Sequence, residues 1–385
     1  MLKIEKRFIN YIEHHKEMIF LILISIIALL IRYAGRDFIS IDMKVSFLKW
    51  YDIIKSGGGV YSLKKQVGDY GLLYQTIISG FTYININPVY CFKIVSIFFD
   101  FLLAGSIAYF VAGFKGNGFC RKRFCYAYAL ILLLPTVVLN SAYWGQCDSI
   151  YTVLVFWSIW FLYKQRYQSA FLMLGIAFAF KLQTILIVPL FFFLYLVKKS
   201  FSILNFLITL FVFWCSGIVS YFYGRSVFEP FHIYFNQIGE YKQMFLNVTS
   251  FWLIGGNNYF YLHRYAILLT IAVLGIGLYS ILSKGNKLES FISLLSASVF
   301  VEWTSIIFLP AMHERYTYVL DLLLVTLALI ENKYIKYAFV SLVFSVITYN
   351  KFLFKGAVID RWCVILYLFA WLHYAYTCFT SDNVY

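Results

Sequence analysis

Several short polar motifs interrupt a chain that is otherwise strongly apolar. WGQCD spans residues 144–148, KLQ spans residues 181–183 and MHERY spans residues 312–316. Their carboxylates could accept a proton, and their cations could stabilise a negatively charged leaving group. Ionisable groups at a membrane span are costly to insert, and they usually face a cavity rather than lipid. We therefore expect these motifs to line one polar chamber.

Each motif also has a simpler structural interpretation. Asp148 could cap the N-terminus of the helix that follows it, and Lys181 could extend its ammonium group to the lipid headgroups. Residues 313–315 could form a solvated loop. Asp100 could form a purely structural pair with Lys93, two turns away on the same predicted helix.

The composition assigns the chain to the polytopic membrane proteins. Of 385 residues, 62% are hydrophobic, 22% aromatic and only 13% charged, which lies outside the range of soluble domains. The net charge of +14 comes from Lys and Arg scattered between apolar segments. Membrane lipids and a phosphate-bearing ligand are therefore the expected partners, and nucleic acid is not. The seven cysteines show no paired spacing, so neither disulfides nor a zinc site are predicted.

The basic segments between the apolar runs predict the topology, because short cytoplasmic loops are rich in Lys and Arg. Both termini are placed inside, together with the loops 114–124, 163–168, 197–200, 283–287 and 331–336. The predicted spans are 18–33, 88–113, 124–142, 149–163, 201–222, 264–283, 289–309, 316–330, 335–350 and 361–379. Two half-length helices, 167–180 and 184–197, meet at KLQ and bring the total to about twelve crossings.

Two large segments, 36–87 and 224–263, fall on the outer side in this topology. The first holds five lysines, so it is either wrongly placed or a binding surface. Residues 71–84 are apolar enough for an extra span, but the inside signal CRKR at 120–123 favours a re-entrant or interfacial helix. The chain shows no internal repeat, so we expect one transmembrane domain covering residues 1–385.

The order of the polar motifs resembles a known family. An acidic residue and a Trp stand in DMKVSFLKWYDIIKSGGG (42–59), followed by DY (69–70), WGQCD, KLQ and MHERY. This series resembles the polytopic GT-C glycosyltransferases, most closely the bacterial relatives of the second mannosyltransferase of GPI-anchor assembly, over about residues 30–330. The resemblance implies an all-α GT-C-like membrane fold of about 10–12 helices. It also implies transfer of a hexose from a polyprenyl-phosphate-linked donor to a glycan or glycolipid acceptor on the extracytoplasmic face.

The same resemblance implies roles for individual residues. The catalytic carboxylate would be Asp42, with Asp37 as its alternative, and the second loop carboxylate would be Asp69, although GLLY follows DY where relatives often carry a proline. The positions implied to bind the donor phosphate are Lys181, Gln183, His313, Glu314 and Arg315. The positions implied to bind the substrate are Tyr70, Trp144, Gln146 and Asp148. No metal ligands are assigned and no cofactor is required, while a divalent cation stays open.

Other classes of function remain as alternatives. A flippase or transporter for a lipid-linked sugar would also need a polar chamber, but it should carry charged residues through the midplane from both sides. An oligosaccharide polymerase or ligase usually has a large outer loop late in the chain, whereas the most acidic outer loop here comes first. A non-enzymatic scaffold would leave the intramembrane ionisable groups unexplained.

Overall fold

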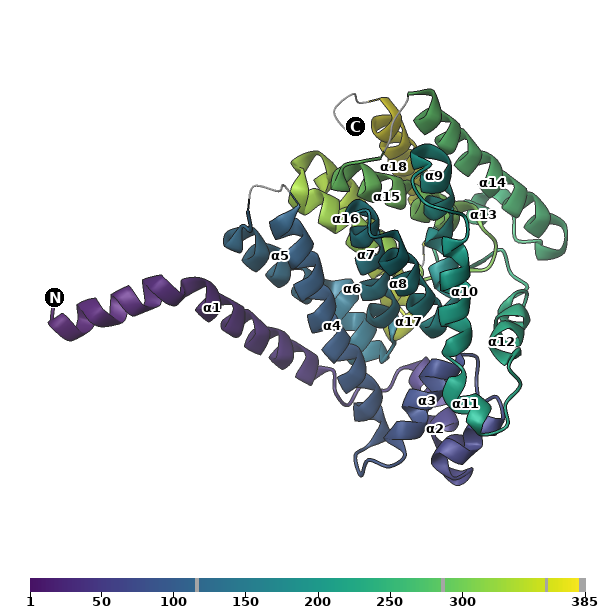
Figure 1. Ribbon diagram of the computed structural model, residues 1–385, viewed down its shortest axis with the longest axis horizontal. Helices are drawn as coiled ribbons and strands as arrows, with labels where there is room; N and C mark the ends of the chain where they lie inside the picture. The colour runs from purple at the N-terminus through teal and green to yellow at the C-terminus, as the bar shows by residue number, and fades with distance from the viewer. Residues whose placement is uncertain (115–117, 285–287, 357–358, 381–385) are drawn as a thin grey trace.

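The protein is represented by a computed structural model that describes residues 1–114, 118–284, 288–356 and 359–380 (Figure 1). Residues 115–117 and 285–287 of two predicted inside loops lie outside the described residues. The same holds for residues 357–358, between the predicted spans 335–350 and 361–379.

The described chain is almost entirely helical. The six helices long and apolar enough to cross a membrane are α1 (Lys3–Ala34), α4 (Pro88–Gly113), α14 (Tyr259–Ser283), α15 (Phe291–Phe308), α17 (Ile335–Phe354) and α18 (Arg361–Thr380). The shorter helices are α2 (Leu48–Ser56), α3 (Leu72–Phe81), α5 (Arg121–Leu133), α6 (Pro135–Val138), α7 (Asp148–Tyr163), α8 (Tyr167–Phe180), α9 (Val188–Lys198), α10 (Asn205–Cys215), α11 (Ile218–Phe222), α12 (Glu229–Gln237), α13 (Trp252–Gly255) and α16 (Tyr318–Ile330). Short 3-10 or π-helical segments are η1 (Met43–Phe47), η2 (Gly59–Lys64), η3 (Leu139–Trp144), η4 (Leu182–Ile187) and η5 (Asn332–Tyr334), and one parallel pair joins β1 (Phe245–Leu246) to β2 (Met312–His313).

These helices make the chain a multi-pass membrane protein, because apolar helices of this length satisfy their own backbone hydrogen bonds in lipid. The predicted span 88–113 coincides with α4. The predicted span 124–142 is broken, since α5 and the segment from Pro135 to Trp144 meet at a bend of 52°. Pro135 causes this break, because proline donates no backbone hydrogen bond and cannot continue the preceding helix. Counted as one span, this pair brings the long crossings to seven in the described chain.

The shorter helices occupy the interior of the bundle. α7 and α16 are 16 and 13 residues long, and both are apolar on nearly all sides. α15 is buried along almost its whole length, whereas α1, α14 and α18 leave most of their apolar side chains at least partly exposed. A helix that is apolar all round is typical of a core or of a membrane. The interior helices therefore form the core, and the peripheral helices present the lipid-facing surface.

The first predicted outer segment folds into η1, α2, η2 and α3 at one end of the bundle, next to α11 (Figure 1). α3 has ten residues, or about 15 Å of helix, which is too short to cross a bilayer. This length agrees with the re-entrant or interfacial helix that the sequence predicts for residues 71–84. WGQCD leads into the start of α7, KLQ follows the end of α8 and MHERY precedes the start of α16, and these helix ends lie at this same end of the bundle. The basic loops at 163–168 and 331–336 follow the other ends of α7 and α16, so they lie at the opposite end of the bundle.

The structure corrects the predicted pairing of Asp100. Its Oδ2 atom accepts hydrogen bonds from Arg32 Nε at 3.0 Å and Arg32 Nη2 at 2.9 Å, and from Ser141 Oγ at 2.5 Å. Lys93 instead donates to three backbone carbonyls, those of Gly35, Arg36 and Phe38. Lys93 therefore caps the end of α1 and holds the chain that leads to the first outer segment.

Candidate active site

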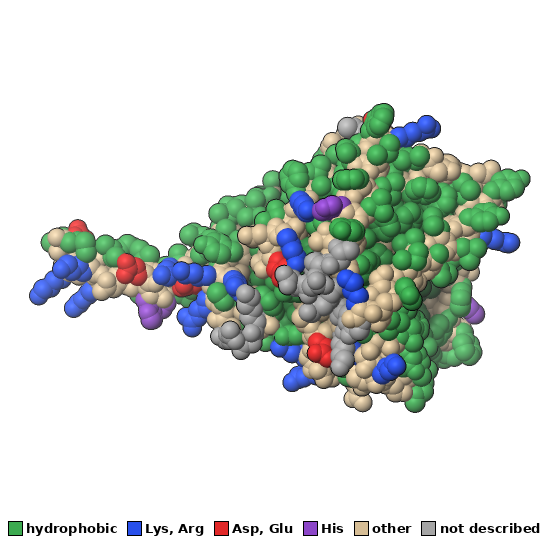
Figure 2. Space-filling model, turned by 90° about the horizontal axis from the view of Figure 1, so that it is seen from above, with side chains coloured by type: hydrophobic (Ala, Val, Ile, Leu, Met, Phe, Trp, Pro, Cys, Tyr) green, Lys and Arg blue, Asp and Glu red, His purple; other side chains and the backbone are tan. Residues whose placement is uncertain are grey.

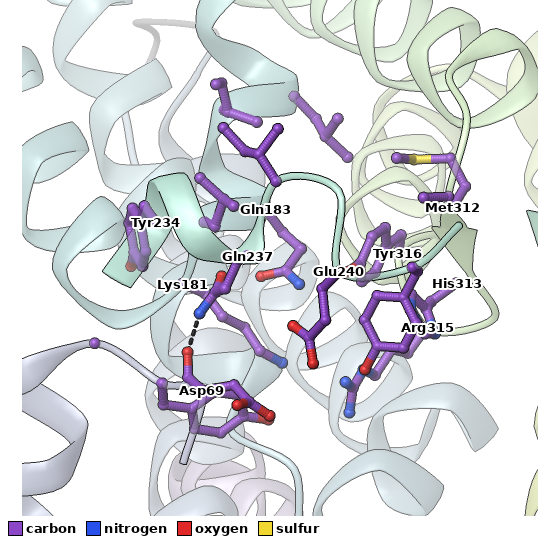
Figure 3. Close-up of a pocket in the computed structure, with 18 of the residues that line it drawn as sticks. Asp69, Lys181, Gln183, Tyr234, Gln237, Glu240, Met312, His313, Arg315 and Tyr316 are labelled. Atoms are coloured by element: carbon purple, nitrogen blue, oxygen red, sulfur yellow. Dashed lines mark hydrogen bonds between the residues drawn. The ribbon is translucent and has the colours of Figure 1, made fainter. Parts of the chain in front are cut away.

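A cavity of about 480 Å³ opens at the end of the bundle where the polar motifs meet (Figure 3). Its wall comes from five stretches that are far apart in the sequence, 42–50, 69–71, 180–186, 234–241 and 309–316, together with Gln146, Tyr259 and Ile267. The motifs predicted to line one chamber thus do lie together. The tertiary fold brings them together because each stands at the end of a different helix.

Asp42 stands at the centre of the polar wall. Three donors converge on its Oδ2 atom: Trp144 Nε1 at 2.8 Å, Gln146 Nε2 at 2.7 Å and Arg315 Nη1 at 3.1 Å. The Asp42 side chain is 24% exposed, so its carboxylate still reaches the cavity. This arrangement orients the carboxylate through its Oδ2 atom.

Gln146 connects this carboxylate to a second charged pair. Its Oε1 atom accepts a hydrogen bond from the Tyr70 hydroxyl at 2.6 Å and a longer one from Lys181 Nζ at 3.5 Å. The Lys181 ammonium forms a close ion pair with Asp148 Oδ1, and both side chains are almost fully buried. Asp148 Oδ2 accepts from the Asn140 amide at 2.7 Å. Asp148 therefore binds Lys181 rather than capping its own helix, and Lys181 does not extend to the headgroups.

Local backbone geometry explains why two side chains of the WGQCD motif can donate hydrogen bonds to Asp42. Gly145 has a φ of 76°, in the left-handed region that favours glycine. A Cβ atom at this position would lie 2.4 Å from Met43 Cε, so a larger residue would have to displace the Met43 side chain as well as adopt this φ. This turn directs the side chains of both Trp144 and Gln146 towards Asp42.

The MHERY motif is held by the β1–β2 pair rather than exposed as a solvated loop. Leu246 aligns with His313, and the Tyr241 ring lies edge-on to the His313 ring with centroids 4.4 Å apart. His313 and Glu314 are buried, with His313 Nδ1 at 3.9 Å from Glu314 Oε2. Arg315 turns into the cavity towards Asp42.

Asp69 lies at the mouth of the cavity and meets the second outer segment. The Gln237 amide donates to the Asp69 backbone carbonyl. Burial raises the pKa of the Asp69 carboxyl. Burial, and after it the neighbouring charge of Asp69, raises the pKa of Glu240, whose carboxylate points into the cavity in Figure 3.

The sequence analysis assigned no site role to any residue of the second outer segment, 224–263. Gln237, Glu240 and Tyr241 line the cavity, as does Trp50 of α2. No spacing links residues 237–241 to the motif at 312–316, because only the parallel strand pair brings them together. The motif DMKVSFLKWYDIIKSGGG did contain Trp50, so its place in the wall could have been inferred.

The structure separates the predicted site residues into three groups. The residues that line the cavity are Asp42, Asp69, Tyr70, Gln146, Lys181, Gln183, His313 and Arg315. The residues that lie behind this wall and contact it are Trp144, Asp148 and Glu314. Asp37 belongs to neither group: it is 62% exposed and contacts Arg36 at 3.1 Å and the Tyr90 hydroxyl at 2.7 Å.

The other side of the cavity is apolar and reaches the surface that faces lipid. Ile185, Leu186, Ile267, Leu309 and Pro310 line it. Ile185 is 48% exposed and Ile267 is 41% exposed, on η4 and on the peripheral helix α14. One chamber thus combines a charged wall with an apolar side that continues to the outer surface of the bundle.

The side chains of the described residues do not form a group of three His, Cys, Asp or Glu that could hold a metal ion.

His313 and Glu314 should make stability respond to pH in opposite directions. Burial raises the pKa of Glu314 from 4.5 to about 7, so the folded state binds the extra proton and the free energy of unfolding falls as pH rises through this interval. Burial, followed by Arg315 and Lys181, lowers the pKa of His313 from 6.5 to about 3, so its contribution rises with pH. The two effects oppose each other in the interval where they overlap.

Glu314→Gln should remove the first of these two effects. We expect the thermal stability of this variant to rise with pH from 4.5 to 6.5. The unaltered protein should show a flatter profile over the same interval. Thermal unfolding of both proteins at a series of pH values measures the difference. Parallel profiles would contradict a buried, protonated Glu314.

Comparison with protein-family models and with curated proteins found no match for this chain.

Proposed function

We propose that the protein is a membrane glycosyltransferase that moves a hexose from a polyprenyl-phosphate-linked donor to a glycan or lipid-linked acceptor. The observation that carries this proposal is the combination of a charged wall and an apolar side in one chamber. A carboxylate and two cations stand on one wall, and an apolar side leads to the surface of the bundle that faces lipid. A lipid phosphate sugar has the matching parts, since it joins an apolar chain to a phosphate and a sugar.

The proposed chemistry assigns a separate role to each wall group. Asp42 accepts the proton of the acceptor hydroxyl as the hydroxyl oxygen bonds to the anomeric carbon of the sugar. The bond from that carbon to the phosphate oxygen breaks, and its electron pair leaves with the polyprenyl phosphate. Lys181 and Arg315 stabilise the charge of this leaving group. In the resembled family, such transfer inverts the anomeric configuration.

Lys181 and Arg315 each have N–H donors left for a phosphate, beyond those that bind their present partners. An ammonium group has three donors, and Lys181 directs one to Asp148 and a second, at 3.5 Å, to Gln146. A guanidinium has five donors, and Arg315 Nη1 uses one on Asp42. Arg315 Nε has no hydrogen-bond partner in the described part of the chain.

We propose that the chamber lies on the extracytoplasmic side of the membrane. The loops 163–168 and 331–336 at the opposite end of the bundle carry Lys and Arg, which favours a cytoplasmic location for that end. The membrane is thus proposed to be the cell membrane, with the donor and the acceptor approaching from its outer leaflet.

Purified protein in nanodiscs, incubated with a panel of polyprenyl-phosphate hexoses and candidate acceptors, tests the proposal. Transfer consumes the lipid-linked sugar and releases polyprenyl phosphate. A lipid-linked sugar flippase, the second candidate, would move the intact donor between leaflets of a vesicle without consuming it. Movement without consumption would overturn the proposal.

Lys181 should be needed to bind the donor. Because its ion pair with Asp148 is buried, Lys181→Met alone would strand a buried carboxylate and destabilise the fold. The double variant Lys181→Met, Asp148→Asn removes both charges together. We expect this variant to fold and to bind the donor at least about tenfold more weakly, since a charge-assisted hydrogen bond to phosphate is lost. Equilibrium binding of a labelled donor measures the effect.

The matched control for this substitution is Lys65→Met, which removes an exposed lysine from the same end of the bundle. Its donor affinity should equal that of the unaltered protein. Undiminished binding by the folded double variant would move the phosphate site away from Lys181.

A further inference from the structure

The N-terminal part of α1 projects sideways from the bundle and contacts no other element along its first residues (Figure 1). α1 has 32 residues, or about 48 Å of helix, which exceeds the roughly 30 Å of a hydrocarbon core. Its apolar run begins only near residue 18. Residues 3–17, here called the α1 arm, therefore extend beyond the membrane-spanning part of the helix.

The α1 arm has two distinct faces. Ile4, Phe8, Tyr11 and Ile12 recur at the spacing of one helix face, and all are exposed, Ile4 by 77% and Phe8 by 63%. Figure 2 shows hydrophobic side chains along one edge of the arm and charged side chains along the other. An exposed apolar stripe of this kind is unfavourable in water, so it needs a surface to cover it.

The charged face of the α1 arm is mainly cationic near its start. Lys3, Lys6 and Arg7 lie opposite the apolar stripe or beside it, and Lys16 stands at the far end. The start of α5 adds a second group of cations, Arg121, Lys122 and Arg123. None of these seven cations forms an ion pair with a carboxylate within the described ranges.

Two contacts place the end of the α1 arm, next to Lys16, beside the start of α5. The Cys125 thiol lies 3.9 Å from the Glu17 carbonyl, and the rings of Phe20 and Tyr126 pack with centroids 6.4 Å apart. The membrane-spanning part of α1 therefore begins beside the start of α5. Lys16 and the three cations of α5 flank this level, and Lys3, Lys6 and Arg7 lie further along the arm.

We propose that the α1 arm lies in the headgroup region of the membrane and binds anionic lipids together with the start of α5. Its apolar stripe enters the boundary of the acyl chains, while its cations contact lipid phosphates. Clustered Lys and Arg next to a membrane helix attract anionic headgroups in this way. The apolar stripe is continuous with the lipid-facing surface of the same helix, which is why a lipid surface is its occupant rather than a protein.

Hydrogen–deuterium exchange of the full chain in nanodiscs tests this proposal. Exchange at residues 3–14 should be slower by about tenfold or more in equal parts phosphatidylglycerol and phosphatidylcholine than in phosphatidylcholine alone, because several cations then contact anionic headgroups. High salt should reduce the difference. Equal exchange in the two lipids would overturn the proposal.

Charge-reversed variants provide the matched comparison. Lys3→Glu, Lys6→Glu and Arg7→Glu together should abolish the dependence on phosphatidylglycerol. The control Lys64→Glu with Lys65→Glu changes two exposed lysines at the other end of the bundle and should keep it. A lipid dependence that survives the triple change would show that these cations do not bind the lipid.

Discussion

Asp42→Asn should reduce glycosyl transfer by about two to four orders of magnitude while leaving the fold intact, because general-base catalysis contributes roughly that much. The asparagine oxygen can still accept from Trp144, Gln146 and Arg315, so the surrounding network keeps its geometry. An amide cannot accept the proton of the acceptor hydroxyl. Turnover of a lipid-linked sugar by purified protein, together with thermal unfolding, measures both effects.

Two further variants separate the carboxylates that were candidates for this role. Asp37 is exposed and lies outside the cavity wall, so Asp37→Asn should retain nearly full turnover. Asp69 lines the cavity, and burial raises the pKa of its carboxyl. Full activity of Asp42→Asn with an inactive Asp69→Asn would transfer the catalytic role to Asp69. Full activity of all three would contradict the proposed function.

Arg32→Met should destabilise the fold by about 3 kcal/mol or more, because it leaves the buried Asp100 carboxylate without its charged partner. Arg32 and Asp100 are 1% and 0% exposed, and their contact joins α1 to α4, with Ser141 of η3 alongside. The loss should appear as a lower unfolding temperature and as faster aggregation in detergent.

The double variant Arg32→Met, Asp100→Leu should recover most of this stability, since replacing a whole buried pair with apolar groups is often neutral or favourable. Arg36→Met provides the surface comparison. It removes an exposed pair with Asp37 and should cost less than about 1 kcal/mol. Equal losses for Arg32→Met and Arg36→Met would contradict a structural role for the Arg32–Asp100 pair.

The sequence alone determined the class of the protein and most of its helices, because these depend on local properties. Long apolar runs predict membrane helices from their length, and the span at 88–113 coincides with α4. The break at KLQ was also evident, since Lys181, in an extended conformation, separates α8 from η4. Predicting that WGQCD, KLQ and MHERY share one chamber required only that buried charges avoid lipid.

Only the tertiary structure decided which charged group meets which. Lys93 was the nearest cation to Asp100 in sequence, but Arg32 reaches it from another helix, and pairing across helices leaves no local signal. The sequence favoured Asp42 over Asp37 only through the family resemblance, whereas the structure shows Trp144 and Gln146 donating to Asp42. The contribution of Glu240 and Tyr241 to the cavity depends on the parallel pair of β1 and β2. Such contacts join residues far apart in the chain, so their geometry follows from packing and not from spacing.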